Sequence, residues 1–269
     1  MRVFLAGLRK LIRRPASLVT LGLMIGLILL VFLAVGATAR QIEAGGSQGD
    51  NAILLVTFPA AYELALGFVL GLGGLLALVY GAAIAGSEWS WGTLKTAVAR
   101  GEGRSWYLLW TFASIALILA VGMLISYALA VIAAYVGAIL AGVPTDGVRD
   151  AATLGRIPEL LGRGWITLVE QAAIGFAVAT VAKSQLAGIG VGIAAFIGVQ
   201  FAGIFIGDVV QWFPFSAAGA ATTAGTTSGG NQQLVPTLDP NTALLVVVAW
   251  LIAALVVAAL VTERAEIGG

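Results

Sequence analysis

Long apolar windows without charged residues constrain the fold of this chain more than any other feature. A helix needs about 20 mostly apolar residues to cross the hydrocarbon core of a bilayer, and the sequence has several windows of at least that length. Charged residues make up only 10% of the chain, against about 25% in a soluble domain. The sequence therefore predicts an all-α integral membrane protein.

The windows predict six spans in a single transmembrane domain, residues 1–269. The expected spans are 16–39, 60–86, 105–141, 164–182, 185–207 and 241–262. The third window is far longer than one crossing requires, and no Pro or charged residue marks a turn near its middle. We therefore expect one long helix that projects beyond the bilayer rather than two crossings.

The distribution of Lys and Arg orients the spans, because these residues are enriched in cytoplasmic loops. With the N-terminus inside, ten of them fall on the inner side and four on the outer side. Both termini are therefore expected in the cytoplasm. The first apolar run is too long for a cleavable signal peptide, so none is expected.

Residues 1–14 have the pattern of an amphipathic helix. At 100° per residue, the apolar side chains fall within an arc of about 120°, and the cations lie on the opposite arc. Such a helix lies in the inner interface, with its cations among anionic headgroups. The alternative is a plain positively charged flank. The candidate membrane-interface residues are Arg9, Lys10, Arg13 and Arg14.

The composition argues against an enzyme. The chain has no Cys and no His, which removes disulfides, thiolate metal sites and His-ligated haem. Its Gly-rich stretches lack the Lys that reaches phosphate in a nucleotide-binding loop. We therefore expect no catalytic residue, no metal or other cofactor in this chain, and no nucleic-acid partner.

Glu170 is the acidic residue that interrupts the fourth window. A carboxylate inside a span is costly and is a candidate functional residue by default. Thr167 and Gln171 share its helical face, and Arg163 lies two turns toward the outside. Two readings stay open: a polar patch on a substrate or proton route, or a structural pair with Arg163 or another helix.

Two connections carry further expectations. The outer segment 208–239 contains Trp212, Phe213 and Phe215, which either re-enter the membrane or form an aromatic belt before a loop of small residues. Asp239 and Pro240 predict the start of the last span. In the preceding outer connection, Pro158 predicts a helix start.

The inner segment 87–104, SEWSWGTLKTAVARGEGR, carries aromatic residues and charges of both signs. We expect a short helix capped by Ser87, with Trp91, Leu94 and Val98 on one face. Gly101 and Gly103 would end it. The alternative is an ordinary solvated loop with interfacial aromatic residues.

Residues 88–95, EWSWGTLK, resemble the E-x-x-x-G-T-[hydrophobic]-[KR] signature of type-2 ABC-transporter permeases. The amphipathic N-terminus, six spans, long third span, short connection at Lys183 and Ser184, and long segment before the last span are similar too. The resemblance implies the permease subunit of an exporter in the plasma (inner) membrane of a prokaryote. It implies a second permease copy and separate cytoplasmic ATPase subunits, which hold ATP and magnesium.

In that family the segment after span two includes a coupling helix that docks on the ATPase. Glu88, Gly92, Thr93, Leu94 and Lys95 match the signature, and Trp91 is expected as a local docking contact or interface anchor. Family members export lipids, polysaccharides, drugs or peptides, and the sequence does not select among them. The alternatives are a self-contained secondary transporter that uses Glu170, and an accessory subunit of a membrane complex.

Overall fold

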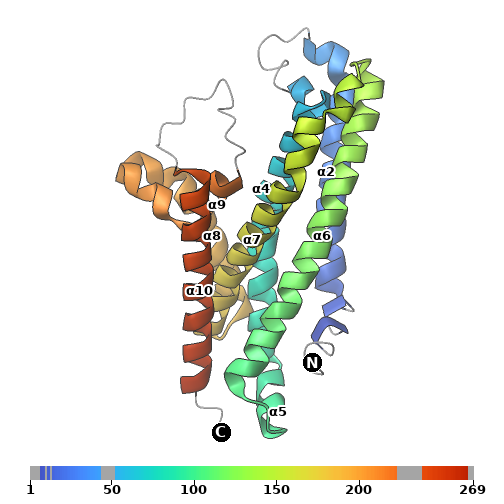
Figure 1. Ribbon diagram of the computed structural model, residues 1–269. Coiled ribbons are helices and arrows are strands. Elements are labelled where there is room, and N and C mark those ends of the chain that lie inside the picture. The colour runs from blue at the N-terminus through green and yellow to red at the C-terminus, as the bar shows by residue number, and fades with distance from the viewer. Residues whose placement is uncertain (1–6, 10, 13, 44–51, 223–237, 266–269) are drawn as a thin grey trace. The chain divides into compact units, whose positions relative to one another are not determined.

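The computed structural model describes residues 7–9, 11–12, 14–43, 52–222 and 238–265, and within these ranges it contains helices and no strand (Figure 1). Five of these helices are long and apolar enough to cross a membrane. The chain is therefore an all-α protein with several candidate membrane spans, as the sequence predicts. Residues 7–9 and 11–12 are helical ahead of the first long helix.

The five long apolar helices are α2 Pro15–Glu43, α4 Ala60–Ser90, α6 Arg104–Ala141, α7 Ala151–Ala182 and α10 Pro240–Arg264. The remaining elements are η1 Leu54–Val56, α5 Thr93–Ala99, η2 Asp146–Arg149, α8 Gln185–Ile206, η3 Gly207–Trp212 and α9 Pro214–Thr222. Among the described residues, short 3-10 helices follow α2, α6 and α8. Within α8, residues Gln185–Val199 form a shorter apolar run.

Several helix boundaries agree with the sequence. The third window forms one continuous helix, α6. Asp239 caps α10 by accepting the backbone N–H groups of Asn241 and Thr242, and Ser184 caps α8 directly after α7.

The start of α7 was predicted wrongly. The helix begins at Ala151, and Pro158 lies inside it rather than in its first turn. The reason is a cap further upstream, because the Asp150 carboxylate accepts the N–H and the hydroxyl of Thr153 at 2.9 and 2.5 Å. Once this cap starts the helix, Pro158 removes one backbone donor from it.

The chain divides into two compact units, which are described separately. The second unit comprises residues 18–73 and 120–162. Its helices α2 and α6 approach so closely that a Cβ on Gly36 would lie 2.4 Å from the Cα of Gly137. The hydroxyl of Tyr62 donates to the Val148 carbonyl at 2.8 Å, which ties α4 to η2.

The first unit comprises residues 1–17, 74–119 and 163–269. In it, α4 packs on α7 through glycines: a Cβ on Gly81 would lie 2.1 Å from the Ala172 carbonyl oxygen, and one on Gly175 would lie 2.1 Å from that of Leu78. The rings of Phe112 and Phe176 meet edge to face between α6 and α7. Figure 1 shows α5 between the ends of α4 and α6.

Candidate functional site

The connection from α4 to α5 turns at Gly92. Helix α4 continues to Ser90, so Ser87 lies inside α4 and does not cap the short helix as the sequence predicted. Gly92 is the N-cap of α5, with φ 65° and ψ 18°. In this left-handed region a Cβ costs roughly 1–2 kcal/mol. Glycine therefore suits the turn, and its carbonyl accepts the N–H of Thr96 at 3.1 Å.

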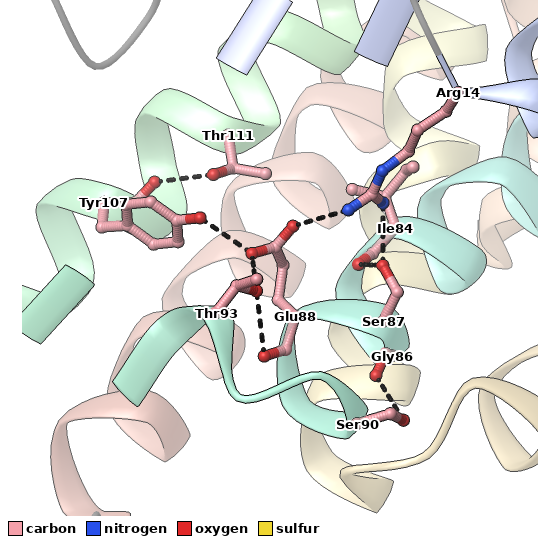
Figure 2. Close-up of polar contacts among 9 residues, drawn as sticks. All are labelled: Arg14, Ile84, Gly86, Ser87, Glu88, Ser90, Thr93, Tyr107 and Thr111. Atoms are coloured by element: carbon pink, nitrogen blue, oxygen red, sulfur yellow. Dashed lines mark hydrogen bonds and ion pairs between the residues drawn. The ribbon is translucent and has the colours of Figure 1, made fainter. Parts of the chain in front are cut away.

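The Glu88 carboxylate lies beside this turn and is buried. Its Oε2 accepts hydrogen bonds from the Tyr107 hydroxyl at 2.8 Å and from the Thr93 hydroxyl. Its Oε1 accepts one from Arg14 Nη2 at 3.3 Å. Figure 2 shows that these donors come from α6, α5 and the residue before α2. Glu88 therefore holds the start of α5 against two other parts of the first unit.

Arg14 completes this network. Its Nη1 donates to the Ser87 hydroxyl at 2.8 Å, and that hydroxyl donates to the Ile84 carbonyl. The side chains of Arg14 and Glu88 are only 11% and 8% exposed. The sequence predicts Arg14 among lipid headgroups, whereas the structure pairs it inside the protein. A buried carboxylate needs a counter-charge, and Arg14 supplies it.

Trp91 presents an exposed aromatic surface on the turn. It is 67% exposed, and the Arg14 Cζ lies 5.0 Å from its ring centroid. Leu94, by contrast, is 4% exposed. The predicted common face of Trp91, Leu94 and Val98 is therefore wrong, because Trp91 precedes α5 and helical spacing does not apply to it. Lys95 belongs to α5, but its side chain lies outside the described part of the structure.

The far end of this connection is tied to the last helix. Arg104 Nη1 donates to the carbonyls of Glu263 and Ala265 at 3.0 and 2.9 Å. The backbone N–H of Ser105 donates to Glu263 Oε1 at 3.2 Å, and the Ser105 hydroxyl donates to the same oxygen. The start of α6 is thus held at the end of α10.

The second candidate group lies within α7. Thr167, Glu170 and Gln171 are all buried, and Glu170 is 0% exposed. The Thr167 hydroxyl donates to the Gly164 carbonyl at 2.8 Å. Arg163 donates through Nη2 to Asn241 Oδ1 at 2.7 Å. Among the described residues, neither Glu170 oxygen has a hydrogen-bond partner, so the structural pair with Arg163, one of the readings left open by the sequence, is not formed.

The remaining predicted positions are described only in part. Arg9 is exposed in the N-terminal helical stretch, and Lys10 and Arg13 lie outside the described residues. Leu11, expected on the lipid-facing arc, is 2% exposed within the protein.

In the segment 208–239, η3 and α9 cover residues 207–222, and residues 223–237 lie outside the described part. The Trp250 indole N–H donates to the Trp212 carbonyl at 3.0 Å, which joins η3 to α10. Phe215 is buried in α9, with its ring 5.2 Å from that of Phe196.

Neither a metal site nor a known relative adds to this picture. In the described ranges, no group of three or more Asp, Glu, His or Cys residues could hold a metal ion. No protein-family model matches the chain, and no curated protein does. The type-2 permease family thus remains a prediction carried by residues 88–95 and the order of the spans.

The sequence predicts Glu88 and Thr93 as site residues, but not Tyr107 and Arg14 as partners of Glu88, or Ser87 as a partner of Arg14. A signal existed, because a carboxylate at the end of an apolar span needs a cation at the same depth. Arg14 was one of several cations assigned to that side of the membrane. Nothing in the linear pattern distinguishes it from the others, since the choice depends on how the first helices pack.

Proposed function

We propose that this chain is the permease subunit of an ATP-binding cassette exporter in the plasma (inner) membrane of a prokaryote. In this proposal α8 is the sixth span, both termini are cytoplasmic, and residues 87–104 form the coupling segment. One observation carries the proposal: the Glu88 network holds α5 in place while Trp91 stays 67% exposed beside it. This is the arrangement that a docking helix requires.

A coupling segment must be stiff to transmit motion from a partner subunit. A separate ATPase that closes on ATP can move this chain only if the segment it grips does not deform. The Glu88 carboxylate links α4 to α5 and α6 through Thr93 and Tyr107. It also accepts a hydrogen bond from Arg14, the residue before α2. Arg104 and Ser105 link the other end of the segment to α10. A force on α5 would thus reach several helices of the first unit together.

In this proposal the two kinds of subunit have separate roles. ATP and magnesium bind to the partner subunit, and this chain contributes the gate, together with a second permease copy. The exposed Trp91 would supply contact area, because aromatic residues are enriched among the residues that dominate binding energy. The cargo is unassigned within the lipids, polysaccharides, drugs and peptides that the resembled family exports.

Copurification from native membranes tests the proposal. We expect the tagged chain to carry a nucleotide-binding protein with it, and Trp91→Ala to reduce the amount at least severalfold. Trp106→Ala is the matched control, because Trp106 is also exposed, at 57%, but lies on α6 outside the coupling segment. Absence of any nucleotide-binding protein, or equal losses in both variants, would contradict the proposal.

The unpartnered carboxylate of Glu170 favours one alternative, a self-contained transporter. Proteoliposomes that contain only this chain and a trapped pH indicator separate the two functions. The exporter subunit is expected to give no proton flux above that of empty liposomes. Flux by the isolated chain that Glu170→Gln abolishes would replace the exporter proposal.

A further inference from the structure

Three acceptor atoms in α7 lack hydrogen-bond donors. They are both carboxylate oxygens of Glu170 and the side-chain oxygen of Gln171, and no described residue donates to any of them. Glu170 is 0% exposed and Gln171 is 6% exposed. Buried polar groups in proteins are nearly always hydrogen-bonded, so each exception calls for an explanation. Here the missing partner is a donor.

The stretches of the neighbouring helices that pack against this part of α7 carry no charged residue. Contacts to α7 come from α4 at Gly81, from α6 at Phe112 and from α8 at Gly188. Ile166 packs against the cluster formed by α9 and α10. Residues 74–87, 105–119, 185–206, 214–222 and 240–262 of these helices contain no Asp, Glu, Lys or Arg.

The other titratable groups nearby are already engaged. Tyr80 on α4 is hydrogen-bonded to Ser17, and Tyr107 on α6 donates to Glu88. On α7 itself, Arg163 is seven residues away, a rise of about 10 Å at 1.5 Å per residue, and it donates to Asn241. Lys183 follows the end of α7, with its Nζ 5.4 Å from the Trp89 ring centroid.

The packing on the α4 side leaves little space for a bulky ligand. A Cβ on Gly74 would lie 2.0 Å from Gln171 Oε1, and one on Gly81 would lie 2.1 Å from the carbonyl oxygen of Ala172. Even one added carbon on α4 would therefore collide with Gln171 or Ala172, the two residues that follow Glu170. An ammonium group of a substrate is larger than that carbon, whereas a proton needs no additional space.

We infer that Glu170 is a proton-binding site that is occupied, and therefore neutral, in the closely packed form of α7. An isolated carboxylate in an apolar interior is so costly that the group neutralises instead. A bound proton removes the charge and turns one carboxylate oxygen into a hydrogen-bond donor. Loss of that proton would require the packing around Glu170 to loosen enough to admit water or a cation. The inference stands whether or not the chain is an exporter subunit.

Infrared spectroscopy of the purified full-length chain tests the protonation directly. At neutral pH we expect the C=O stretch of a protonated carboxyl group, a band that is lost in Glu170→Gln and displaced in Glu170→Asp. Glu159→Gln is the matched control, because Glu159 lies on the same helix but is exposed. A wild-type spectrum without the band, or a band that Glu170→Gln retains, would overturn the inference.

Thermal unfolding supplies a second readout that does not depend on band assignment. The folded chain holds a proton that the unfolded chain releases above the ordinary Glu pKa of about 4.3. Tm should therefore fall as the pH rises above that value, until Glu170 loses its proton in the folded chain as well. That fall should be lost in Glu170→Gln and kept in Glu159→Gln. A Tm that rises with Na⁺ or Li⁺ in the wild type, but not in Glu170→Gln, would show a metal-cation site and overturn the proton assignment.

Discussion

Glu88 and Arg14 carry opposite charges at a place where neither is well hydrated. Their side chains are 8% and 11% exposed, and the carboxylate also accepts bonds from Tyr107 and Thr93. The net energy of such a pair is small relative to an apolar replacement, but removal of one partner leaves a buried charge without compensation. The pair therefore specifies where α5 starts more than it adds stability.

Removal of one member of this pair should be costly. We expect Glu88→Ala to lower the free energy of unfolding by about 3–5 kcal/mol, the usual cost of an uncompensated buried charge. The double variant with Arg14→Ala should lose clearly less than the sum of the two single changes. Unfolding in mixed detergent micelles measures all three variants.

The exposed pair in the second unit is the control. Glu63 and Arg156 are 28% and 47% exposed, with 3.6 Å between Oε1 and Nη1. Exposed pairs contribute about 0–1 kcal/mol, so Glu63→Ala should have a small effect. Additive losses at Arg14 and Glu88 would mean that the ion pair does not hold the turn.

The cap at Asp150 should make the start of α7 sensitive to acid. Hydrogen bonds from the hydroxyl and the N–H of Thr153 lower the pKa of Asp150 below its usual value. A lowered folded-state pKa contributes stability above the unfolded-state pKa, and this contribution is lost as the pH falls through the folded-state value. Protection of the Thr153 amide from hydrogen exchange should therefore decrease in acid.

Asp150→Asn keeps an acceptor at the cap but cannot titrate in this range. Its Thr153 amide protection should not change with pH once intrinsic exchange rates are corrected. If the wild-type protection were equally flat, the carboxylate would not be what caps α7.

At the scale of helices, the sequence predicts where each helix lies along the chain better than it predicts which residues of two helices are in contact. Apolar windows locate the long helices because length and hydropathy are local properties, and Asp239 and Ser184 act as caps through neighbouring backbone groups. The prediction that Pro158 starts α7 is wrong, because the cap at Asp150 starts the helix seven residues earlier. Contacts between helices depend on tertiary packing, which cannot be read from a single stretch of sequence. Thus Gly175 meets Leu78 across α4 and α7, while a Cβ built on Gly162 has no described atom within 4 Å outside its chain neighbours and the adjacent backbone of α7.

Gly175→Ala and Gly162→Ala should have opposite effects. Both glycines lie in α7, and an alanine is favoured over a glycine in a helix by about 1 kcal/mol. At Gly162 that gain is expected in full. At Gly175 the new methyl carbon would lie 2.1 Å from the Leu78 carbonyl oxygen, and forcing α4 away should cost about 1–3 kcal/mol. The same micelle unfolding assay measures both, and equal stabilisation would refute the close α4–α7 contact.

For the whole molecule, the orientation in the membrane is a prediction from the distribution of Lys and Arg along the chain. Five long apolar helices follow from composition, but the sixth span depends on α8, in which the shorter apolar run ends at Val199. The coupling role proposed for residues 87–104 depends on the same orientation. The candidate site is only partly predictable from the sequence. Residues 88–95 indicate the segment, whereas Arg14 is identified as the partner of Glu88 only by the packing of the folded chain.

Cysteine labelling decides both the orientation and the number of spans, because the chain contains no cysteine of its own. Ala99, Ala152 and Asp208 are exposed and lie in α5, at the start of α7 and in η3. In intact cells, a membrane-impermeant maleimide should label Ala152→Cys and Asp208→Cys but label Ala99→Cys only after permeabilisation. Protection of Asp208→Cys would mean that α8 does not cross and would reduce the spans to five. Labelling of Ala99→Cys from outside would place α5 on the wrong face for any cytoplasmic ATPase, because α6 would then cross in the opposite direction.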